Sequence, residues 1–379
     1  MFLRRLELVQ FRTYPQLTLE LPDGLTAVVG PNGVGKTNLV EAVAWPLLLT
    51  SVRGVANEAL VRQGASAAVV RAELEASAVE GEPDPTAGGD GASLPRQVLI
   101  ESEISARGRT RVLLNRQAGA RRRDVAEVGR VTVFSPDDLV LVKGSPVERR
   151  RFLDDALVAA DPRLDVVRAD YEKVVRQRNA LLRQAHGRLD DAGRLTLEVW
   201  DAQLIDRGER LGRARSSLVK RLGPLVEAAY RELAGRDDEV AVTYQAPWLD
   251  AGLGALVAGR RAEELRRGVT LVGPHRDELA LGLHGLVART QASQGEQRSL
   301  ALSLRLAVHR LLTERFGAPP ILVLDDVLSE LDPQRRRALI GGVPAGQALL
   351  TTAGDLPEEV EPAAVLEVNR PGEVSWRAA

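Results

Sequence analysis

Cysteine is absent from this chain, and aromatic residues are scarce. With no cysteine among 379 residues, disulfide bonds and cysteine-based metal sites are excluded. Aromatic side chains make up only 3% of the sequence, which argues against the base-stacking platforms of single-strand-binding proteins. If the protein binds nucleic acid, we expect sequence-independent contacts with the phosphate backbone, and these are sensitive to salt.

Long apolar runs and a strong net charge are also missing. No run approaches the roughly 20 apolar residues needed to cross a bilayer, and the segment from Met1 to Arg5 lacks a secretory hydrophobic region. We therefore expect a cytoplasmic protein with no membrane partner. Because the formal net charge is only −1, a DNA-binding surface would have to be a local basic patch.

The glycine-rich segment Gly30-Pro31-Asn32-Gly33-Val34-Gly35-Lys36-Thr37 matches G-x-x-x-x-G-K-[ST] at every fixed position. Leu25 to Val29 before it predicts a short buried strand, and Asn38 to Val43 after it predicts the first turns of a helix. In that context the backbone N–H groups surround a phosphate, Lys36 reaches the β- and γ-phosphates, and the Thr37 hydroxyl ligates Mg²⁺. The segment predicts a binding site for a nucleoside triphosphate and Mg²⁺.

The order of predicted elements indicates an α/β protein with an inserted helical lobe. Residues 1–145 are β-rich around the phosphate loop, with strand patterns at residues 3–8, 17–21, 67–74, 97–104 and 109–114. Residues 146–235 are helical. Residues 236–379 return to α/β, with strands at 321–324 and 348–351 and a helix after Pro333. The nucleotide-binding sheet is therefore expected to combine both ends of the chain, and the polar tract at residues 80–91 reads as a flexible surface insertion.

The helical part carries recognisable start signals. Ser145-Pro146-Val147-Glu148 is typical of a capping box with proline at the first helical position. Asp161-Pro162 predicts the start of a second helix. From there to about Arg221 the pattern indicates two antiparallel helices with a break near residues 187–193, too short for a long coiled coil.

A second nucleotide-binding element is predicted near the C-terminus. Ile321 to Leu324 is an apolar strand that ends in the acids Asp325 and Asp326. Such a strand beside a phosphate loop supplies a carboxylate that holds Mg²⁺. We assign Asp325 to the metal and Asp326, with Lys36, to catalysis, Asp326 polarising the attacking water. Taken alone, the pattern also fits a buried strand that simply ends in an acidic loop.

The pentapeptide Ser293-Gln294-Gly295-Glu296-Gln297 opens a long leucine-rich helix, and Ser293 is a natural N-cap. In isolation it could be an ordinary helix start. Placed before the acidic strand, it resembles the Ser-x-Gly-x-Gln motif of ABC-type ATPases. That resemblance implies that Ser293, Gly295 and Gln297 bind the γ-phosphate of ATP held by a second subunit.

Five further segments indicate which family within the ABC-type ATPases the chain resembles. They are Phe11-Arg12-Thr13-Tyr14, Phe134 to Leu139, Lys143 to Asp154, Gly273-Pro274-His275-Arg276-Asp277-Glu278 and Asp325 to Asp332. Together they resemble the RecF family, bacterial recombinational-repair ATPases related to the SMC proteins. The resemblance implies an ABC-type ATPase head with a helical second lobe and a nucleotide-binding role for Arg12. It also implies ATP-dependent homodimerisation on DNA, preference for single-strand/double-strand junctions, and cooperation with RecO and RecR in gap repair, replication restart and SOS induction.

The chain departs from the wider ABC pattern in two places. Asp326 stands where a catalytic glutamate is usual, and the strand ending at Thr351-Thr352 has no switch histidine. Both features favour slow, weak ATP hydrolysis, in which ATP acts mainly as a dimerisation switch. We also expect DNA to stimulate the ATPase. Gln63 and the Ser135-Pro136-Asp137 turn remain alternatives for the metal-sensing loop.

Arginine triplets at residues 121–123, 149–151 and 335–337 are candidates for DNA contact, although charge runs are often only solvated helix faces. The first triplet is favoured. The second is expected near the nucleotide or the lobe boundary, and the third in a structural role or at the dimer rim. His275 and Arg276 are expected to be exposed after a strand and a Gly-Pro turn, where they could contact either DNA or the other lobe. The alternative function is the ATPase subunit of an ABC transporter; a long-armed SMC protein would need heptad repeats that are absent.

Overall fold

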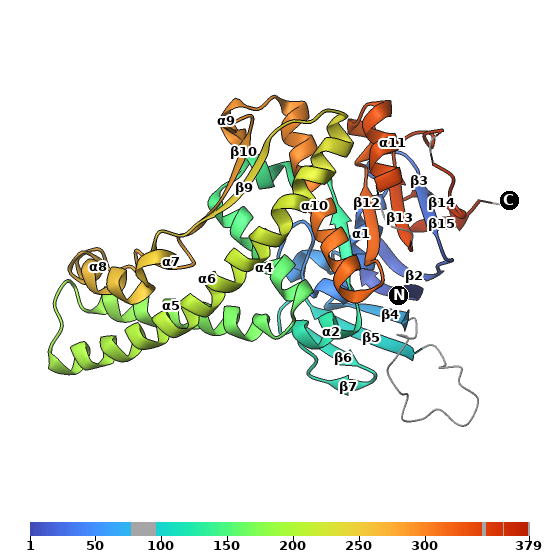
Figure 1. Cartoon of the computed structure of the whole chain (residues 1–379). Coiled ribbons are helices and arrows are strands. Elements are labelled where there is room, and N and C mark those ends of the chain that lie inside the picture. Colours follow the sequence, from blue (N-terminus) through green and yellow to red (C-terminus); the bar gives the residue numbers. More distant parts are fainter. Residues whose placement is uncertain (77–95, 343–345, 359, 378–379) are drawn as a thin grey trace, which may run out of the picture. The chain divides into compact units, whose positions relative to one another are not determined.

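The computed structural model describes residues 1–76, 96–342, 346–358 and 360–377. The chain divides into two compact units. Figure 1 labels their helices and strands. Unit 1 contains Met1–Asp138, Glu232–Gly235 and Val308–Ala379, and unit 2 contains Leu139–Arg231 and Arg236–Ala307. The tract expected to be a flexible insertion, residues 80–91, lies outside the described residues. Within the described part, no helix is long and apolar enough to span a bilayer.

An antiparallel sheet of unit 1 has the strand order β2-β1-β4-β5-β6-β7. Its strands are β1 (Phe2–Phe11), β2 (Tyr14–Glu20), β4 (Ala67–Ala76), β5 (Arg96–Ser105), β6 (Arg111–Leu114) and β7 (Gln117–Ala118). The apolar residues that alternate along β1, such as Leu6 and Leu8, are fully buried. This alternation is the pattern of a strand with one face on the core, and it made the first strands recognisable in the sequence.

The other six-stranded sheet of unit 1, which leads into the glycine-rich segment, has the order β15-β14-β3-β13-β12-β8. Its strands are β3 (Leu25–Val29), β8 (Val131–Phe134), β12 (Ile321–Asp325), β13 (Ala348–Thr352), β14 (Ala364–Arg370) and β15 (Glu373–Trp376). Strand β3 pairs in parallel with β13 on one side and with β14 on the other. The expectation that both ends of the chain build this sheet is confirmed, and the fold is of the α/β class, as expected.

Helix α1 (Lys36–Leu48) packs against strands of both sheets and so fills the space between them. Its Trp45 is 0% exposed, and the surrounding core takes apolar residues from both sheets. This burial explains why α1 is apolar nearly all round and not amphipathic. The other short elements of unit 1 are η1 (Asn57–Leu60), α2 (Arg122–Val128), η2 (Pro136–Leu139), η3 (Leu328–Glu330) and α11 (Pro333–Gly342).

Unit 2 combines helices with a small antiparallel sheet of order β11-β10-β9. The strands are β9 (Val240–Gln245), β10 (Glu278–Leu283) and β11 (Leu286–Val287). The helices are α3 (Val140–Lys143), α4 (Pro146–Ala160), α5 (Leu164–Gln184), α6 (Asp191–Ala234), α7 (Trp248–Ala251), α8 (Leu253–Arg267), α9 (Ala288–Gln291) and α10 (Gln294–Phe316). The last residues of α6 and the second half of α10 belong to unit 1.

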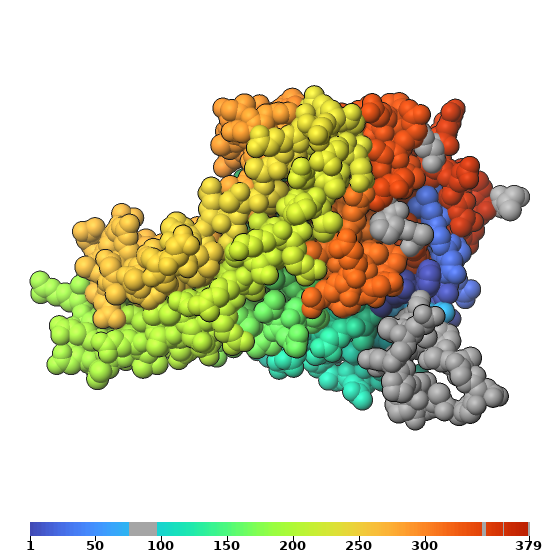
Figure 2. Space-filling view, in the orientation of Figure 1, coloured from blue at the N-terminus to red at the C-terminus, as the bar shows by residue number. Residues whose placement is uncertain are grey.

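The predicted helical pair is α5 and α6, joined at residues 185–190. Arg178 of α5 bonds Asp201 of α6, and Figure 1 shows the two helices running back along each other from this turn. In the space-filling view, α8, in gold, lies against the green α5 (Figure 2). Helices α5, α6 and α8 therefore pack together.

Some boundaries differ from the sequence expectations. Helix α4 does begin at Pro146, but Ser145 makes no side-chain cap bond, so the predicted capping box is wrong. Helix α5 begins at Leu164, after the Asp161-Pro162 start signal, and α6 continues past Arg221 to Ala234. Unit 2 also takes in residues 236–307, which lie outside the predicted helical lobe (146–235), and the division into 1–145, 146–235 and 236–379 stays a prediction.

Candidate functional site

The phosphate-loop segment joins β3 to α1, and its glycines are needed for its shape. Gly30, Gly33 and Gly35 have φ values of +156°, +82° and +111°. A Cβ added to Gly30 would lie 2.1 Å from the carbonyl oxygen of Val368, and one added to Gly35 would lie 2.7 Å from Thr13 Oγ1. The first glycine thus lets β14 pass close to the loop, and the last supplies the left-handed turn that starts the helix.

Lys36 points into the loop that it follows. Its Nζ donates to the carbonyl oxygens of Gly30 at 2.7 Å and Pro31 at 2.8 Å. Burial lowers the pKa of the ammonium, although the nearby charges of Asp326 and Asp325 raise it. The cation therefore occupies the loop, held by weak neutral acceptors that an anionic phosphate can replace.

Tyr14 supports the same loop from β2. Its hydroxyl donates to the carbonyl oxygen of Gly35 at 3.0 Å, and burial raises the pKa of the phenol to about 12, so the hydroxyl stays protonated. This contact links the sequence segment Phe11–Tyr14 directly to the phosphate loop.

The acidic end of β12 lies at the start of α1. Thr37 Oγ1 donates to Asp325 Oδ1 at 3.3 Å, and burial raises the pKa of the Asp325 carboxyl, an effect opposed by hydrogen bonds from Thr351 and Thr37. These are hard oxygen atoms of the kind that Mg²⁺ prefers. Asp326 adds a buried Oδ1 that has no hydrogen-bond partner among the described residues. The donor set and this open acceptor fit Mg²⁺ and a water molecule.

Arg12 contacts the same helix but is engaged by a carboxylate. Its Nε and Nη2 donate to Glu41 Oε2 at 2.9 and 2.7 Å, and Ser51 donates to the other carboxylate oxygen. Glu41 is fully buried. The sequence reading missed Glu41, although a carboxylate among apolar positions of α1 was the available signal. A contact of Arg12 with nucleotide stays a prediction.

The two alternatives for the metal-sensing loop lie next to different sheets. The Ser135–Asp137 turn follows β8, which pairs in parallel with β12, so it shares the sheet edge at which Asp325 lies. Gln63 is exposed in the segment between η1 and β4, next to the antiparallel sheet. The topology favours the Ser135–Asp137 turn, since the carboxyl ends of neighbouring parallel strands meet at one edge.

The pentapeptide Ser293–Gln297 belongs to unit 2, and α10 begins at its second residue, Gln294. Ser293 is exposed, and its backbone N and its Oγ each donate to Glu296 Oε2 at 2.8 Å. Arg236 Nη2 donates to the other oxygen of Glu296 at 2.7 Å. An arginine thus offsets the acidic charge at this helix N-terminus, where an anion is expected to bind.

Gly295 and Gln297 differ in their surroundings. Gly295 lies in the first turn of α10 and is half-buried. Gln297 is 3% exposed, and its Nε2 donates to the carbonyl oxygens of Ala288 and Arg289 at 3.0 and 3.1 Å. Its amide therefore ties α10 to α9, so a nucleotide-binding role for Gln297 stays a prediction and would require these bonds to change.

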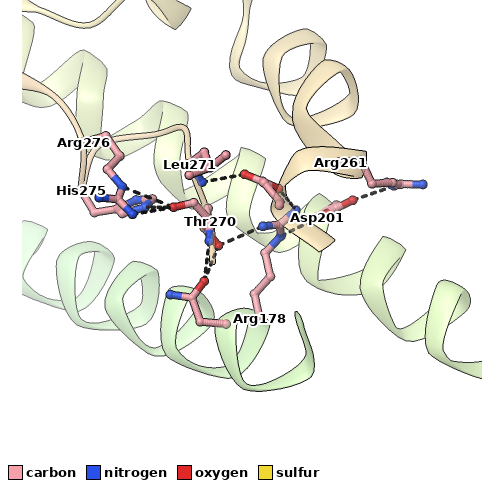
Figure 3. A network of polar contacts seen from close by, with 9 residues as sticks. Arg178, Asp201, Arg261, Thr270, Leu271, His275 and Arg276 are labelled. Carbon is pink, nitrogen blue, oxygen red and sulfur yellow. Dashed lines mark hydrogen bonds and ion pairs between the residues drawn. The ribbon is translucent and has the colours of Figure 1, made fainter. Parts of the chain in front are cut away.

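The segment Gly273–Glu278 is not the exposed turn that was expected. It follows a helix instead of a strand, since α8 ends at Arg267 and β10 begins within the segment at Glu278. His275 Nδ1 lies 2.7 Å from the hydroxyl of Tyr171, and burial lowers the pKa of His275 to about 4. Arg276 is exposed, but its guanidinium donates to the carbonyl oxygen of Thr270 at 3.1 and 3.3 Å (Figure 3).

A buried ion-pair network continues from Thr270 (Figure 3). Arg178, 0% exposed, donates to Thr270 Oγ1 at 2.9 Å, to Asp201 at 2.7 Å and to Glu264 at 2.6 Å. Each of the three guanidinium nitrogens donates to an oxygen. A buried charged group needs such partners to offset its loss of hydration. The network therefore fixes α5, α6 and α8 against the segment that carries His275.

The arginines of the three triplets described here have their partners within their own unit. Arg150 Nη1 donates to the carbonyl oxygen of Asp277 at 2.8 Å inside unit 2, so it is used within the fold. Arg123 pairs with Asp124 at 3.2 Å at the start of α2. Arg335 pairs with Asp332 at 2.8 Å, and Arg336 Nε bonds the carbonyl oxygen of Leu328, which agrees with the structural role expected for the third triplet.

Comparison with known proteins gives consistent matches. Residues 2–345 match the family model described as RecF/RecN/SMC N terminal domain. The chain is 44% identical over 381 residues to "DNA replication and repair protein RecF" of Frankia alni, covering 95% of this chain and 96% of that protein. It is 42% identical over 371 residues to the protein of the same name from Acidothermus cellulolyticus, covering 94% and 95%.

Among solved structures, "Structure of the recombination mediator protein RecF-ATP in RecFOR pathway" matches with a TM-score of 0.87 at 24% identity, covering 100% of this chain and 98% of that one. At this identity the match establishes the fold. Taken with the family model and the sequence relatives, these matches show that the chain belongs to the RecF family, within the wider RecF/RecN/SMC group.

Proposed function

We propose that this chain is an ATP-dependent DNA-binding protein of recombinational gap repair, replication restart and SOS induction, acting in the cytoplasm as a homodimeric clamp. The observation that carries the proposal is the meeting of the phosphate loop with the acidic strand, where Thr37 Oγ1 and Asp325 Oδ1 are 3.3 Å apart. The names of the relatives support the repair context, and they do not favour the alternative of an ABC transporter subunit.

Each residue of the site has a defined task in this proposal. Lys36 leaves the carbonyl oxygens of Gly30 and Pro31 and binds the β- and γ-phosphates, because a phosphate is the stronger acceptor. Thr37 and Asp325 hold Mg²⁺, which neutralises phosphate charge when bound. The open Oδ1 of Asp326 orients the attacking water and receives its proton. Aspartate reaches less far than the usual glutamate, so hydrolysis is slow.

The second half of the site comes from a partner subunit. Ser293 is exposed at the N-terminus of α10, so its hydroxyl can exchange Glu296 for the γ-phosphate of ATP bound by another copy. ATP then acts as the ligand that closes the dimer, and hydrolysis reopens it. The structural relative is named as RecF-ATP in the RecFOR pathway, which supports ATP as the nucleotide here and RecO and RecR as partners.

DNA contact is proposed at the tip of the β5–β6 hairpin. Arg107 and Arg109 are exposed there, and no carboxylate among the described residues forms an ion pair with either side chain. Asn57 Nδ2 bonds Thr110 Oγ1 at 3.2 Å, which brings the hairpin next to η1 and the exposed Arg62. Exposed guanidinium groups on neighbouring loops form the local basic patch that a near-neutral protein needs to attract DNA.

Sedimentation of the full chain with and without ATP, Mg²⁺ and gapped DNA tests the proposal. We expect a monomer without nucleotide and a dimer that co-sediments with DNA when ATP is present. A preference for gapped over blunt duplex DNA would support junction recognition. A chain that keeps one mass in all conditions and ignores DNA would contradict the clamp.

The hairpin is tested separately. Replacing Arg107 and Arg109 together by Gln should weaken DNA binding and reduce its salt dependence, by about one unit of slope for each lost phosphate contact. A matched control replaces Arg194 of α6, which is exposed but paired with Asp191. If both variants bind DNA like the parent, the DNA surface lies elsewhere.

A further inference from the structure

The hydroxyl of Thr351 lies between the two acids of the nucleotide site. Thr351 lies near the end of β13, opposite Asp325 in the parallel register with β12. Its Oγ1 donates to Asp325 Oδ1 at 2.8 Å and accepts from the backbone N–H of Asp326 at 2.9 Å. The residue is 0% exposed, so water cannot replace either bond. A single side-chain oxygen therefore connects the side chain of one acid to the backbone of the next.

Both bonds act on groups that need external support. Within the described part of the chain, the buried Asp325 carboxylate has only the hydroxyls of Thr351 and Thr37 as hydrogen-bond donors from side chains. Asp326 has a φ of +51°, in the left-handed region that residues with a side chain rarely adopt. The N–H of Asp326 is fixed by the hydroxyl of Thr351, so this bond helps to hold the turn that aims the second acid.

Packing alone does not explain why residue 351 is a threonine, with a hydroxyl group, and not a valine. The preceding residues Leu349 and Leu350 are apolar and buried, and valine has the same shape as threonine in such a strand. A buried hydroxyl costs free energy unless it is hydrogen-bonded. Here its donor and its acceptor are both directed at the acidic pair, which points to the site as the reason for threonine.

We propose that Thr351 is a positioning residue for Mg²⁺ and for the attacking water: it orients the Asp325 carboxylate toward the metal and holds Asp326 in its left-handed turn. The inference rests on the proposed ATPase function and deepens it. It also assigns a polar side chain to the strand end where a switch histidine is absent. Thr351 acts through the acids and need not touch the nucleotide.

The test compares Thr351→Val, which removes the hydroxyl and keeps the shape, with Thr351→Ser, which keeps the hydroxyl. Thr352→Val is the matched control, because Thr352 is the next residue of β13, and its Oγ1 accepts a long 3.4 Å bond from Gly354 N. For each full-length protein, ATP affinity is measured in EDTA and across a Mg²⁺ titration, together with hydrolysis.

We expect Thr351→Val to bind ATP in EDTA within about twofold of the parent, because the phosphate loop is intact. It should need about tenfold more Mg²⁺ to reach half of its Mg²⁺-dependent gain in affinity, the usual scale for losing a group that supports a metal ligand. Hydrolysis at saturating Mg²⁺ should also fall by about tenfold, while Thr351→Ser and Thr352→Val resemble the parent.

A Mg²⁺ dependence of Thr351→Val equal to that of the parent would overturn the inference, as would an equal shift in Thr352→Val. If Thr351→Val does not fold, Thr351→Ala replaces it, and the same shift relative to Thr351→Ser is required. A parent that binds no ATP would instead overturn the proposed function, so the two failures are distinguishable.

Discussion

Arg149 and Glu278 form a two-bond ion pair, with Nε to Oε1 at 2.7 Å and Nη2 to Oε2 at 2.8 Å, although they are 129 positions apart. Both belong to segments that the sequence marks as characteristic, one at the start of α4 and one at the start of β10. Bidentate pairing of this kind fixes orientation as well as distance. Arg149, like Arg150, is therefore used inside unit 2.

Lys36→Ala should weaken ATP binding by about 100-fold, since charge-assisted bonds to phosphate contribute roughly 1.5 to 3 kcal/mol each. The fold should persist, because the hydrogen bonds of Nζ go to the loop carbonyls of Gly30 and Pro31. Calorimetric titration with ATP gives the affinity and a thermal melt checks folding. Unchanged affinity in a folded variant would remove the phosphate-loop assignment.

Asp326→Asn should bind ATP and dimerise like the parent but hydrolyse ATP at least about 100-fold more slowly, the contribution typical of a general base. The open carboxylate oxygen Oδ1 of Asp326 is the group affected. Single-turnover hydrolysis measures the rate, and light scattering with ATP and Mg²⁺ measures the dimer. Should the variant turn over at the parental rate, a different group must position the water.

Ser293→Arg should leave ATP binding to the monomer intact and prevent ATP-dependent dimerisation. Ser293 caps α10, and losing a cap costs about 1 kcal/mol, but the larger effect is steric, because the exposed N-terminus of the helix would no longer admit a phosphate. Light scattering at saturating ATP is the measurement. A variant that still doubles in mass would show that the dimer uses another surface.

Arg178→Ala should lower the free energy of unfolding by about 3 to 5 kcal/mol, because Asp201 and Glu264 would lose their buried cationic partner. The control is Arg176→Ala on the same helix, whose side chain is 68% exposed and 3.9 Å from Glu172, and which should change stability by less than about 0.5 kcal/mol. Urea unfolding distinguishes the two. Equal effects would mean that the buried network carries no special stability.

His309 should make stability depend on pH. It is buried beside Thr132, and burial lowers its pKa from 6.5 to about 4, so the folded chain binds fewer protons than the unfolded chain between these values. Its stabilising contribution is present above pH 6.5 and is lost as pH falls toward 4, by on the order of 2 to 3 kcal/mol. His309→Gln should flatten this part of the unfolding curve, and an unchanged slope would show that other groups cause it.

The sequence predicted the structure best where a local pattern of residues is typical of one kind of element. Gly30 to Thr37 and the apolar strand before Asp325 predicted the nucleotide sheet and its chain order, since loop glycines and buried strands leave strong local patterns. Pairing partners leave no such pattern. Glu41, Thr351 and Glu278 each bond residues that are distant in sequence or lie on another element, so their importance is visible only once the chain is folded.

The capping box at Ser145 and the exposure of His275 were misjudged for a related reason. Ser145 has the right spacing from Glu148, but its side chain makes no cap bond, so spacing alone did not decide the contact. His275 follows glycine and proline, which often mark surface turns. Gly273 is needed here because the hydroxyl oxygen of Tyr171 lies 2.6 Å from the position that a Cβ would take.

The pairing of β3 also bears on how the protein is made. The strand that leads into the phosphate loop, Leu25–Val29, has β13 and β14 as its neighbours in the sheet, and these come from residues 348–370. Contacts this distant in sequence form slowly, because a long loop must close first. During synthesis, the ribosome must therefore reach β13, at residues 348–352, before β3 gains either partner. A nascent chain stalled before β13 would hold the complete glycine loop on an unpaired apolar strand, a target for chaperones and a site for aggregation.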